Sequence, residues 1–202
     1  SRFFKDVSNS KSPEWLQQRL ISIGLRPINA LVDITNFITI DLGRPLHVFD
    51  ADKIGSSLVM KLASDKDKIL ALDNKEYQLD TTTTIIADQK QPLAIAGVIG
   101  GLESGCNETT KNVFLEVALF DPSKVAKVGR RLGINSDARY RFERGLDKEM
   151  VEEGLEYATF LINQICGGTV SKNISAGKIE LDKIKIPYDF SFFQKIIGID
   201  LS

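Results

Sequence analysis

The stretch VFLEVALF, residues 113–120, decides the fold class of this chain. Its apolar residues occur at both odd and even positions, which is typical of a strand covered on both faces. The stretch LAIAGVIGG, residues 93–101, shows the same pattern. Shorter β runs precede these two: LVMKL (58–62), ILAL (69–72), YQL (77–79) and TIIAD (84–88). DNKE at 73–76 predicts a hairpin connection, so we expect a mostly antiparallel β region between residues 58 and 118.

Helical segments lie on both sides of this β region. In SPEWLQQRLISIG (12–24) we expect Ser12 to be the N-cap, Pro13 to lie in the first turn and Gly24 to end the helix. Its apolar stripe consists of Trp15, Leu16, Leu20 and Ile23. A further helical block follows Asp121, and a long amphipathic helix is predicted within residues 148–168. The sequence therefore predicts an α+β fold, not alternating βαβ units.

The segment from residue 28 to 49 mixes signals. INALV (28–32) is strand-like, whereas DITNFITIDLG (33–43) predicts a short helix. Pro45 then favours an extended segment through His47 to Phe49. Near the end of the chain, TVSKNI (169–174) and KIELDKIKIPY (178–188) again have strand character.

Composition excludes several classes of protein. The chain has 202 residues, 43% hydrophobic and 26% charged, which is ordinary for a globular protein. No apolar run approaches the roughly 18–20 residues that cross a membrane, and no secretory leader opens the chain. Two distant cysteines, Cys106 and Cys166, and one histidine argue against a zinc site and a disulfide framework, so a reducing cytoplasm is expected. The absence of an initial Met and the apolar ending FSFFQKIIGIDLS indicate a piece of a longer polypeptide.

Four features are candidates for function, and each has a structural alternative. Glu116 among apolar neighbours is either an outward-facing residue of a strand or a buried acceptor for one specific donor. The single histidine, His47, either holds a loop or faces a ligand. AGVIGG (96–101) lacks the dinucleotide fingerprint, and its glycines form a tight turn or allow a ligand to approach the backbone. Ser136 is suited to cap the helix DARYRFERG.

Charge is concentrated in one segment. The formal net charge is −1, which argues against an overall electrostatic attraction to nucleic acid. Residues 124–148, however, hold eight Lys or Arg against three acidic residues. This segment either lies against phosphates or is a solvated helix face with internal ion pairs.

Six blocks of the sequence together carry a resemblance to a known family. They are SPEWLQQRL, GLRPINALVDITNF, DLGRPLHVFDADKI, AIAGVIGG, LEVALFDP and RRLGINSDARYRFERGLD. In this order and spacing they resemble the β-subunit of bacterial phenylalanyl-tRNA synthetase, in its third and fourth domains, over about residues 10–170. The resemblance implies a three-layer fold with an unusual β-sandwich. It divides the chain into a linker (1–11), the editing domain (12–180) and the start of a following domain (181–202).

The same resemblance implies a hydrolytic editing site for tyrosine wrongly attached to the tRNA for phenylalanine. A synthetic pocket that is apolar rejects an added hydroxyl only about 10²-fold, whereas translation needs about 10⁴. A second site can select for the hydroxyl, because an acceptor left unpaired by phenylalanine costs about 1–3 kcal/mol. By its place in the LE block, Glu116 matches the family residue for this task.

The remaining site residues are implied by the same matching. The resemblance assigns Arg26 and Asn36 to the pocket lining, His47 to the ester or terminal adenosine, Gly97 and Gly100 to the close approach of the amino acid, and Ser136 and Ala138 to the far wall. The family usually has Thr where this chain has Ser136, which leaves the side-chain fit open. His47 is expected to orient the substrate in preference to acting as a general base, because the local sequence offers no carboxylate partner.

Partners and cofactors follow from the whole synthetase. We expect the acceptor end of the tRNA for phenylalanine, with Arg130, Arg131 and Arg141 as RNA contacts, and a synthetase α-subunit within an α2β2 heterotetramer. No membrane partner and no metal are expected, and the fragment needs no cofactor, since ATP and Mg serve only the whole synthetase. The alternative function is a non-catalytic module that docks tRNA.

Overall fold

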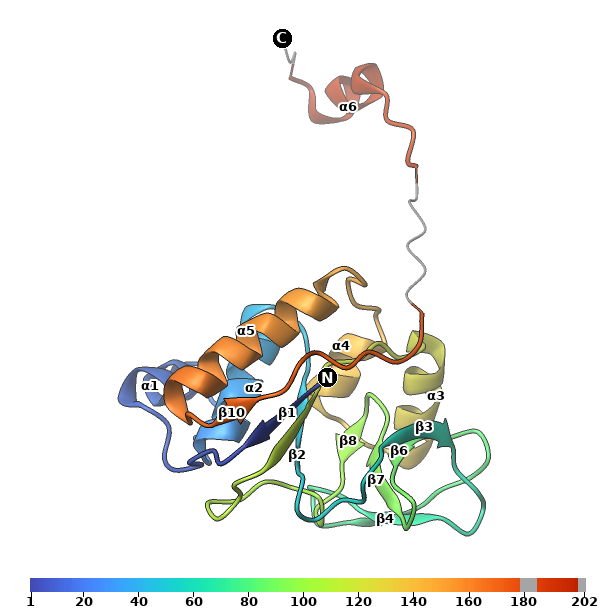
Figure 1. Cartoon of the computed structure of the whole chain (residues 1–202). Coiled ribbons are helices and arrows are strands. Elements are labelled where there is room, and N and C mark those ends of the chain that lie inside the picture. The colour runs from blue at the N-terminus through green and yellow to red at the C-terminus, as the bar shows by residue number, and fades with distance from the viewer. Residues whose placement is uncertain (179–184, 200–202) are drawn as a thin grey trace.

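The computed structural model describes residues 1–178 and 185–199 (Figure 1). Every strand pair in this part of the chain is antiparallel. Helices lie before and after the strands, so the predicted α+β class is confirmed. None of the described helices combines the length and apolar composition needed to cross a bilayer.

The first sheet has the order β10-β1-β9-β2. Its strands are β1 (Arg2–Lys5), β2 (His47–Asp50), β9 (Val113–Glu116) and β10 (Thr169–Val170). The prediction that residues 1–11 are a linker is wrong, because β1 is an inner strand paired with both β9 and β10. Phe4 of β1 is fully buried, and this apolar burial explains why the segment is part of the domain.

The second sheet has the order β3-β6-β7-β8. Its strands are β3 (Val59–Leu62), β6 (Thr84–Ala87), β7 (Pro92–Ile95) and β8 (Ile99–Gly100). The predicted hairpin is confirmed as β4 (Lys68–Leu70) paired with β5 (Glu76–Gln78). The stretch predicted as one buried strand, 93–101, forms two strands, because the chain reverses between β7 and β8 at Gly97 with φ +69°.

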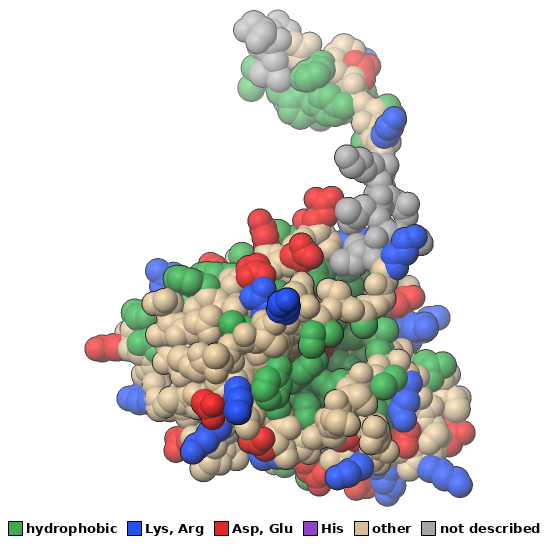
Figure 2. Space-filling model, viewed as in Figure 1, with side chains coloured by type: hydrophobic (Ala, Val, Ile, Leu, Met, Phe, Trp, Pro, Cys, Tyr) green, Lys and Arg blue, Asp and Glu red, His purple; other side chains and the backbone are tan. Residues whose placement is uncertain are grey.

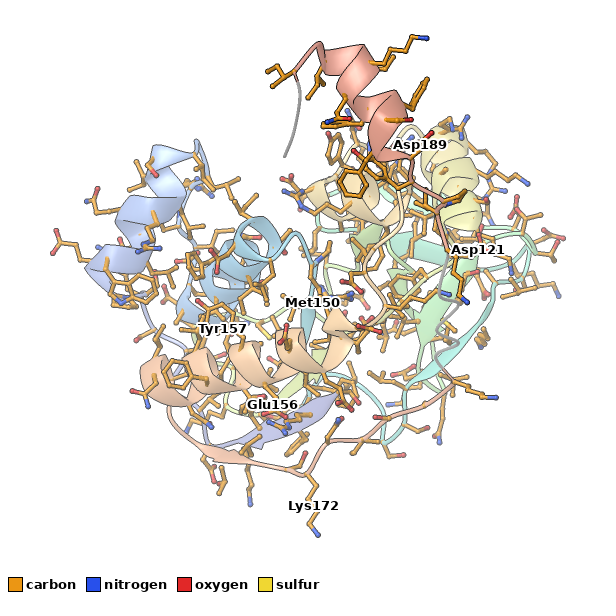
Figure 3. The ribbon with its side chains drawn as sticks, turned by 90° about the horizontal axis from the view of Figure 1, so that it is seen from above. Asp121, Met150, Glu156, Tyr157, Lys172 and Asp189 are labelled. Carbon is orange, nitrogen blue, oxygen red and sulfur yellow. The ribbon has the colours of Figure 1, made fainter. Side chains whose placement is uncertain are left out.

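Two groups of helices cover the sheets. The helices α1 (Glu14–Ser22), α2 (Ala30–Asp41) and α5 (Met150–Ile165) pack on the first sheet. Figure 3 shows Tyr157 and Glu156 on opposite sides of α5, where Tyr157 contacts Phe37 of α2 and Glu156 accepts from Arg2 Nη1 at 3.0 Å. The helices α3 (Pro122–Leu132) and α4 (Asp137–Phe142) pack on the second sheet.

The two sheets face each other. Phe49 of β2 and Phe114 of β9 leave the first sheet on the face opposite its helices and pack against Ile86 and Ala94 of the second sheet. Alternation along the strands explains this arrangement, since Val48 and Leu115, one residue away, point to the helices. The result is a helix layer, a β-sandwich and a second helix layer, as the predicted three-layer arrangement requires.

Two helix boundaries differ from the prediction. Ser12 does not cap α1. Its Oγ instead donates to the buried carboxylate of Asp33 at 2.5 Å, and Pro13 occupies the N-cap position. INALV is not a strand, because α2 already begins at Ala30. The Asn29 side chain accepts from Val32 N at 3.1 Å, so a capping amide determines where the helix starts.

The end of the chain contains one more helix, α6 (Phe190–Ile197), capped by Asp189. It falls in the predicted start of a following domain. Most of the strand predicted at 178–188 lies outside the described residues, and residues 185–188 form no strand.

Candidate functional site

His47 and Glu116 lie directly opposite each other. The strands β2 and β9 pair with His47 against Glu116 and Phe49 against Phe114. Residues opposite each other in an antiparallel pair leave the sheet on the same face. His47 and Glu116 therefore point toward the second sheet, beside the cluster that contains Phe49 and Phe114. The His47 and Phe49 rings meet edge to face with centroids 4.4 Å apart.

The Glu116 carboxylate is partly buried and makes no hydrogen bond within the described residues. Burial raises its pKa from 4.5 to about 7. The ammonium group of Ser1 acts in the opposite direction, but its effect on the pKa is smaller than that of burial. Glu116 is therefore not a strand residue in open solvent. Its carboxylate is a partly buried, unpaired acceptor on the face of β9 that points toward the second sheet.

The His47 imidazole is also short of partners. Its Nε2 atom is buried and has no hydrogen-bond partner among the described residues. Burial lowers the pKa of His47 from 6.5 to about 4, so the ring is neutral at physiological pH. No hydrogen bond joins the imidazole to a carboxylate of the described residues, and the predicted choice of substrate orientation over general-base catalysis stays a prediction.

Gly100 of β8 lies against this imidazole. A Cβ atom at Gly100 would lie 2.9 Å from His47 Nε2 and closer still to Cε1, and 3.1 Å from Leu72 Cδ1. The glycine therefore allows the second sheet to close on the histidine. The predicted approach of a ligand to Gly100 is untested, but the structure brings Gly100, His47 and Glu116 together.

Gly97 serves the turn that precedes β8. A Cβ atom there would lie 2.8 Å from Phe120 Cδ2 and 2.9 Å from Val125 Cγ2. Its side-chain position is thus occupied by protein atoms, and any contact of Gly97 with a ligand has to use its backbone. That predicted contact stays a prediction.

Ser136 connects this turn to helix α4. Its Oγ donates to Val98 O at 2.5 Å and accepts from Arg139 N at 3.0 Å, which confirms Ser136 as the helix cap. The next residue but one, Ala138, packs against the core between α3, α4 and the second sheet. Ser136 is therefore bonded to the glycine turn, and Ala138 packs against the same hydrophobic cluster that contains Val98.

Arg26 and Asn36 come from the helical side of the molecule. Arg26 is exposed in the loop before α2, and Asn36 is partly buried on α2. Neither side chain makes a hydrogen bond or ion pair within the described residues, so both are available to a ligand. The loop is held by Asp33, whose second carboxylate oxygen accepts from Ile28 N at 2.8 Å.

The three predicted RNA contacts differ in their surroundings. Arg131 pairs with Asp80 and donates to Thr82 Oγ1 at 2.8 Å, and Arg141 pairs with Asp137 at 2.8 Å. Of the three, Arg130 alone has no acidic partner within the described residues, and its Nε donates to Ala126 O of its own helix. Internal ion pairs thus account for much of the basic segment, while its binding to RNA remains a prediction.

Arg44 was not among the predicted site residues, although it is almost fully buried behind the site. It donates to the carbonyl oxygens of Ala118 and Asp147, and Gly154 of α5 leaves room for its side chain. Arg44 therefore fixes the chain just after Glu116. A sequence signal existed, because an arginine between Gly43 and Pro45 in an apolar stretch is unusual on a simple strand.

One face of the molecule carries an apolar hollow. On the face shown in Figure 2, hydrophobic side chains gather in a hollow between the two halves of the body, and no histidine is visible. Among the described residues, no group of three or more His, Cys, Asp or Glu is placed to hold a metal ion. The chemistry available at the site is that of one carboxylate, one neutral imidazole and backbone amides.

A known family matches most of this chain. The B3/4 domain family matches residues 1–167. The chain belongs to the B3/4 domain family. The chain is 50% identical over 200 residues to the phenylalanine–tRNA ligase beta subunit of Nitrobacter winogradskyi and 49% identical over 201 residues to that of Brucella suis. The two matches include 99% and 100% of this chain. The chain spans about a quarter of the length of each relative.

A solved structure has the same fold. The B3/4 domain aligns over its full length with an N-terminal fragment of the phenylalanyl-tRNA synthetase beta subunit from Pyrococcus horikoshii, with a TM-score of 0.52 and 15% identity. It covers 57% of that chain. At this identity the likeness concerns the fold alone.

Proposed function

We propose that this B3/4 domain is the editing module of a phenylalanine–tRNA ligase β-subunit and hydrolyses tyrosine misattached to the tRNA for phenylalanine. The observation that carries the proposal is the Glu116 carboxylate, partly buried, without a hydrogen-bond partner in the described chain and directly opposite His47. A carboxylate that is partly withdrawn from water and has no donor in the described protein is suited to a donor that a ligand brings.

Tyrosine brings such a donor. Its phenolic O–H satisfies Glu116, whereas phenylalanine leaves the carboxylate desolvated and unpaired. The difference is worth about 1–3 kcal/mol for one hydrogen bond, and more for a charged acceptor. The site then selects tyrosine by the group that a synthetic pocket rejects only weakly.

Hydrolysis itself needs little from the protein, because the aminoacyl ester is already reactive. In the proposed mechanism the neutral His47 uses one ring nitrogen to orient the ester or the terminal adenosine, while water attacks the carbonyl carbon. An imidazole with a pKa of about 4 is a weak base, so we assign it orientation and not proton abstraction. Arg26, Asn36, Gly97, Gly100, Ser136 and Ala138 would form the surroundings of the amino acid.

The names of the relatives support the wider context. We infer that the domain works within a longer synthetase in the cytoplasm, beside an α-subunit in a heterotetramer, on the acceptor end of the tRNA. ATP and Mg would serve that synthetase in aminoacylation, and the hydrolytic step proposed for this domain uses neither.

The test is the hydrolysis of tyrosyl-tRNA and phenylalanyl-tRNA for phenylalanine by the chain and by a synthetase that contains it. Glu116→Gln should lower the preference for the tyrosyl ester by about 10- to 100-fold, in line with one charge-assisted hydrogen bond. Glu103→Gln, on an exposed loop, is the matched control. Equal hydrolysis of both esters by the unaltered protein, or an unchanged preference in Glu116→Gln, would favour the non-catalytic tRNA-docking alternative.

A further inference from the structure

Helix α3 presents a row of cations that have no acidic partner within residues 1–178 and 185–199. Lys124, Lys127 and Arg130 are exposed and follow one another at intervals of three residues, so they lie on adjacent turns of one face. Neither lysine makes a side-chain hydrogen bond or ion pair with any described residue, and Arg130 bonds only to Ala126 O. The row extends about 9 Å along the helix axis.

The opposite face of α3 is fixed to the protein. Val125 and Val128 are buried in the core beneath the second sheet. At the C-terminal end, Arg131 is held by Asp80, Thr82 and Thr83. The cationic row is therefore presented by a rigid helix, which reduces the ordering that binding requires.

A small apolar pocket adjoins the first lysine of the row. Its volume is about 110 Å³, and its lining includes Met60, Leu119, Phe120, Asp121 and Lys124. None of the predicted editing residues lines it, and Phe120 and Val125 separate it from Gly97. Met60, on the edge strand β3, is 61% exposed and adds an apolar side chain to the rim of the pocket.

Asp121 adds a polar group to this pocket. As the cap of α3 it accepts from Ser123 N at 2.8 Å and Lys124 N at 3.1 Å with Oδ1 alone. Its other oxygen, Oδ2, has no hydrogen-bond partner within residues 1–178 and 185–199. Figure 3 shows Asp121 beside the N-terminal end of α3.

We infer that the outer face of α3 binds a single-stranded segment of RNA, with backbone phosphates on Lys124, Lys127 and Arg130 and one base in the pocket beside Asp121. Spaced cations next to an apolar pocket are the combination that single-stranded nucleic acid requires, because phosphates need positive charge and an unstacked base needs an apolar surface. A carboxylate accepts from the exocyclic amino group of cytosine or adenine, which uracil lacks.

The pocket and the free Asp121 oxygen favour RNA over an acidic protein segment. An acidic segment would use the cations, but it would leave the pocket and the free Asp121 oxygen without a role. The inference rests on the proposed function in one respect, namely that the ligand is RNA, which the names of the relatives support. It does not depend on hydrolysis.

The experiment measures the binding of hexacytidylate and hexauridylate to the 202-residue chain at several salt concentrations. The double variant Lys124→Ala/Lys127→Ala should weaken both affinities at least tenfold at low salt. It should also reduce the slope of log affinity against log salt by about 1.4, since each single-strand phosphate contact contributes about 0.7. Lys11→Ala/Lys172→Ala is the matched control, because it removes the same charge elsewhere, and Figure 3 shows Lys172 on a different side from Asp121.

A second variant tests the base pocket. Asp121→Asn keeps a capping side chain but can replace the free acceptor oxygen by an amide donor. The wild-type chain should bind hexacytidylate several-fold more tightly than hexauridylate, and Asp121→Asn should remove this preference. No binding of either probe, an equal loss in the control, or an unchanged slope would overturn the phosphate row, and an absent preference would overturn the base pocket.

The result can be separated from the editing proposal. Glu116→Gln should bind both probes like the wild type. Absence of ester hydrolysis together with lysine-dependent binding of RNA would remove the editing proposal and leave this one. If Lys124→Ala/Lys127→Ala changes neither ester hydrolysis nor RNA affinity, the RNA-binding inference is overturned and the editing proposal is kept.

Discussion

His47 and Glu116 are cross-strand partners on β2 and β9, yet neither side chain has a hydrogen bond to the described protein. Their surroundings favour the uncharged form of each, since burial moves the pKa of the acid up to about 7 and that of the base down to about 4. An interior pair of this kind is normally bonded or replaced by apolar residues. The lack of partners within the described protein is consistent with the proposed ligand site, which stays a prediction.

The first prediction concerns the titration of Glu116. An NMR titration of its carboxyl carbon should give a pKa of about 7 in the folded chain against 4.5 in a model peptide. The folded form then holds the proton more tightly, so ionisation destabilises it progressively from pH 4.5 to 7. Glu116→Gln should raise the free energy of unfolding at pH 8 by up to about 3 kcal/mol and should change it little at pH 4. A measured pKa below 5 would contradict the burial.

The second prediction concerns the charge at Ser1. The Ser1 ammonium lowers the pKa of Glu116, so a chain acetylated at this nitrogen should show a higher pKa for Glu116 than the free chain. The comparison needs only the same NMR titration on the two forms. The acetylated nitrogen keeps one N–H, so the bonds to Ile174 O from Ser1 N at 3.1 Å and from Ser1 Oγ at 2.7 Å are both compatible with the loss of the charge. An identical pKa in both forms would show that the ammonium lies farther from the carboxylate.

A third prediction tests the contact between the sheets. Gly100→Ala places a methyl group against His47 Cε1 and Nε2, so the imidazole has to move. We expect a loss of about 1–3 kcal/mol in the free energy of unfolding and a change in the chemical shifts of the imidazole protons. Gly105→Ala is the control, because its nearest neighbours are 3.2 Å and 3.6 Å away. An unshifted imidazole signal in Gly100→Ala would refute the contact.

The sequence predicted the elements better than their connections. Most of the strands were identified by alternating apolar and polar residues or by apolar residues at both odd and even positions. The capping residue Asp121 marked the start of α3 correctly. The linker prediction failed, because Arg2–Lys5 gains its strand character only from β9 and β10 on either side. Ser12 failed as a cap for a similar reason, since Asp33, 21 residues away, binds its hydroxyl.

The candidate site shows the same limit. The sequence alone left Glu116 between two alternatives, and only the register of β9 against β2 places it opposite His47. Cation counts suggested a basic surface, but the acidic partner of Arg131 is Asp80, about 50 residues earlier in the chain. The local sequence predicts neither the register of His47 against Glu116 nor the ion pair of Arg131 with Asp80, because both arise from tertiary packing.

The fourth prediction separates two adjacent arginines. Arg131→Ala removes the links to Asp80, Thr82 and Thr83 and should lower the free energy of unfolding by about 1 kcal/mol, a modest value because the ion pair is partly exposed. Arg130→Ala should change stability by less than about 0.5 kcal/mol, since it breaks only a bond to its own helix. Urea unfolding of both variants measures the difference. Equal losses would mean that the anchor to Asp80 contributes nothing.

The last prediction concerns the hydroxyl of Ser136. Ser136→Ala removes both the cap of α4 and the bond to Val98 O, so it should lower the free energy of unfolding by about 1–2 kcal/mol. Ser136→Thr keeps the hydroxyl and adds a methyl group next to the glycine turn, so stability should stay within about 1 kcal/mol of the wild type. In the editing assay the two variants should also diverge. Loss of the hydroxyl frees the turn that carries Gly97 and lowers hydrolysis of the tyrosyl ester, whereas Thr preserves it. If Ser136→Thr loses as much activity as Ser136→Ala while keeping its stability, the extra methyl group and not the hydrogen bond controls the pocket.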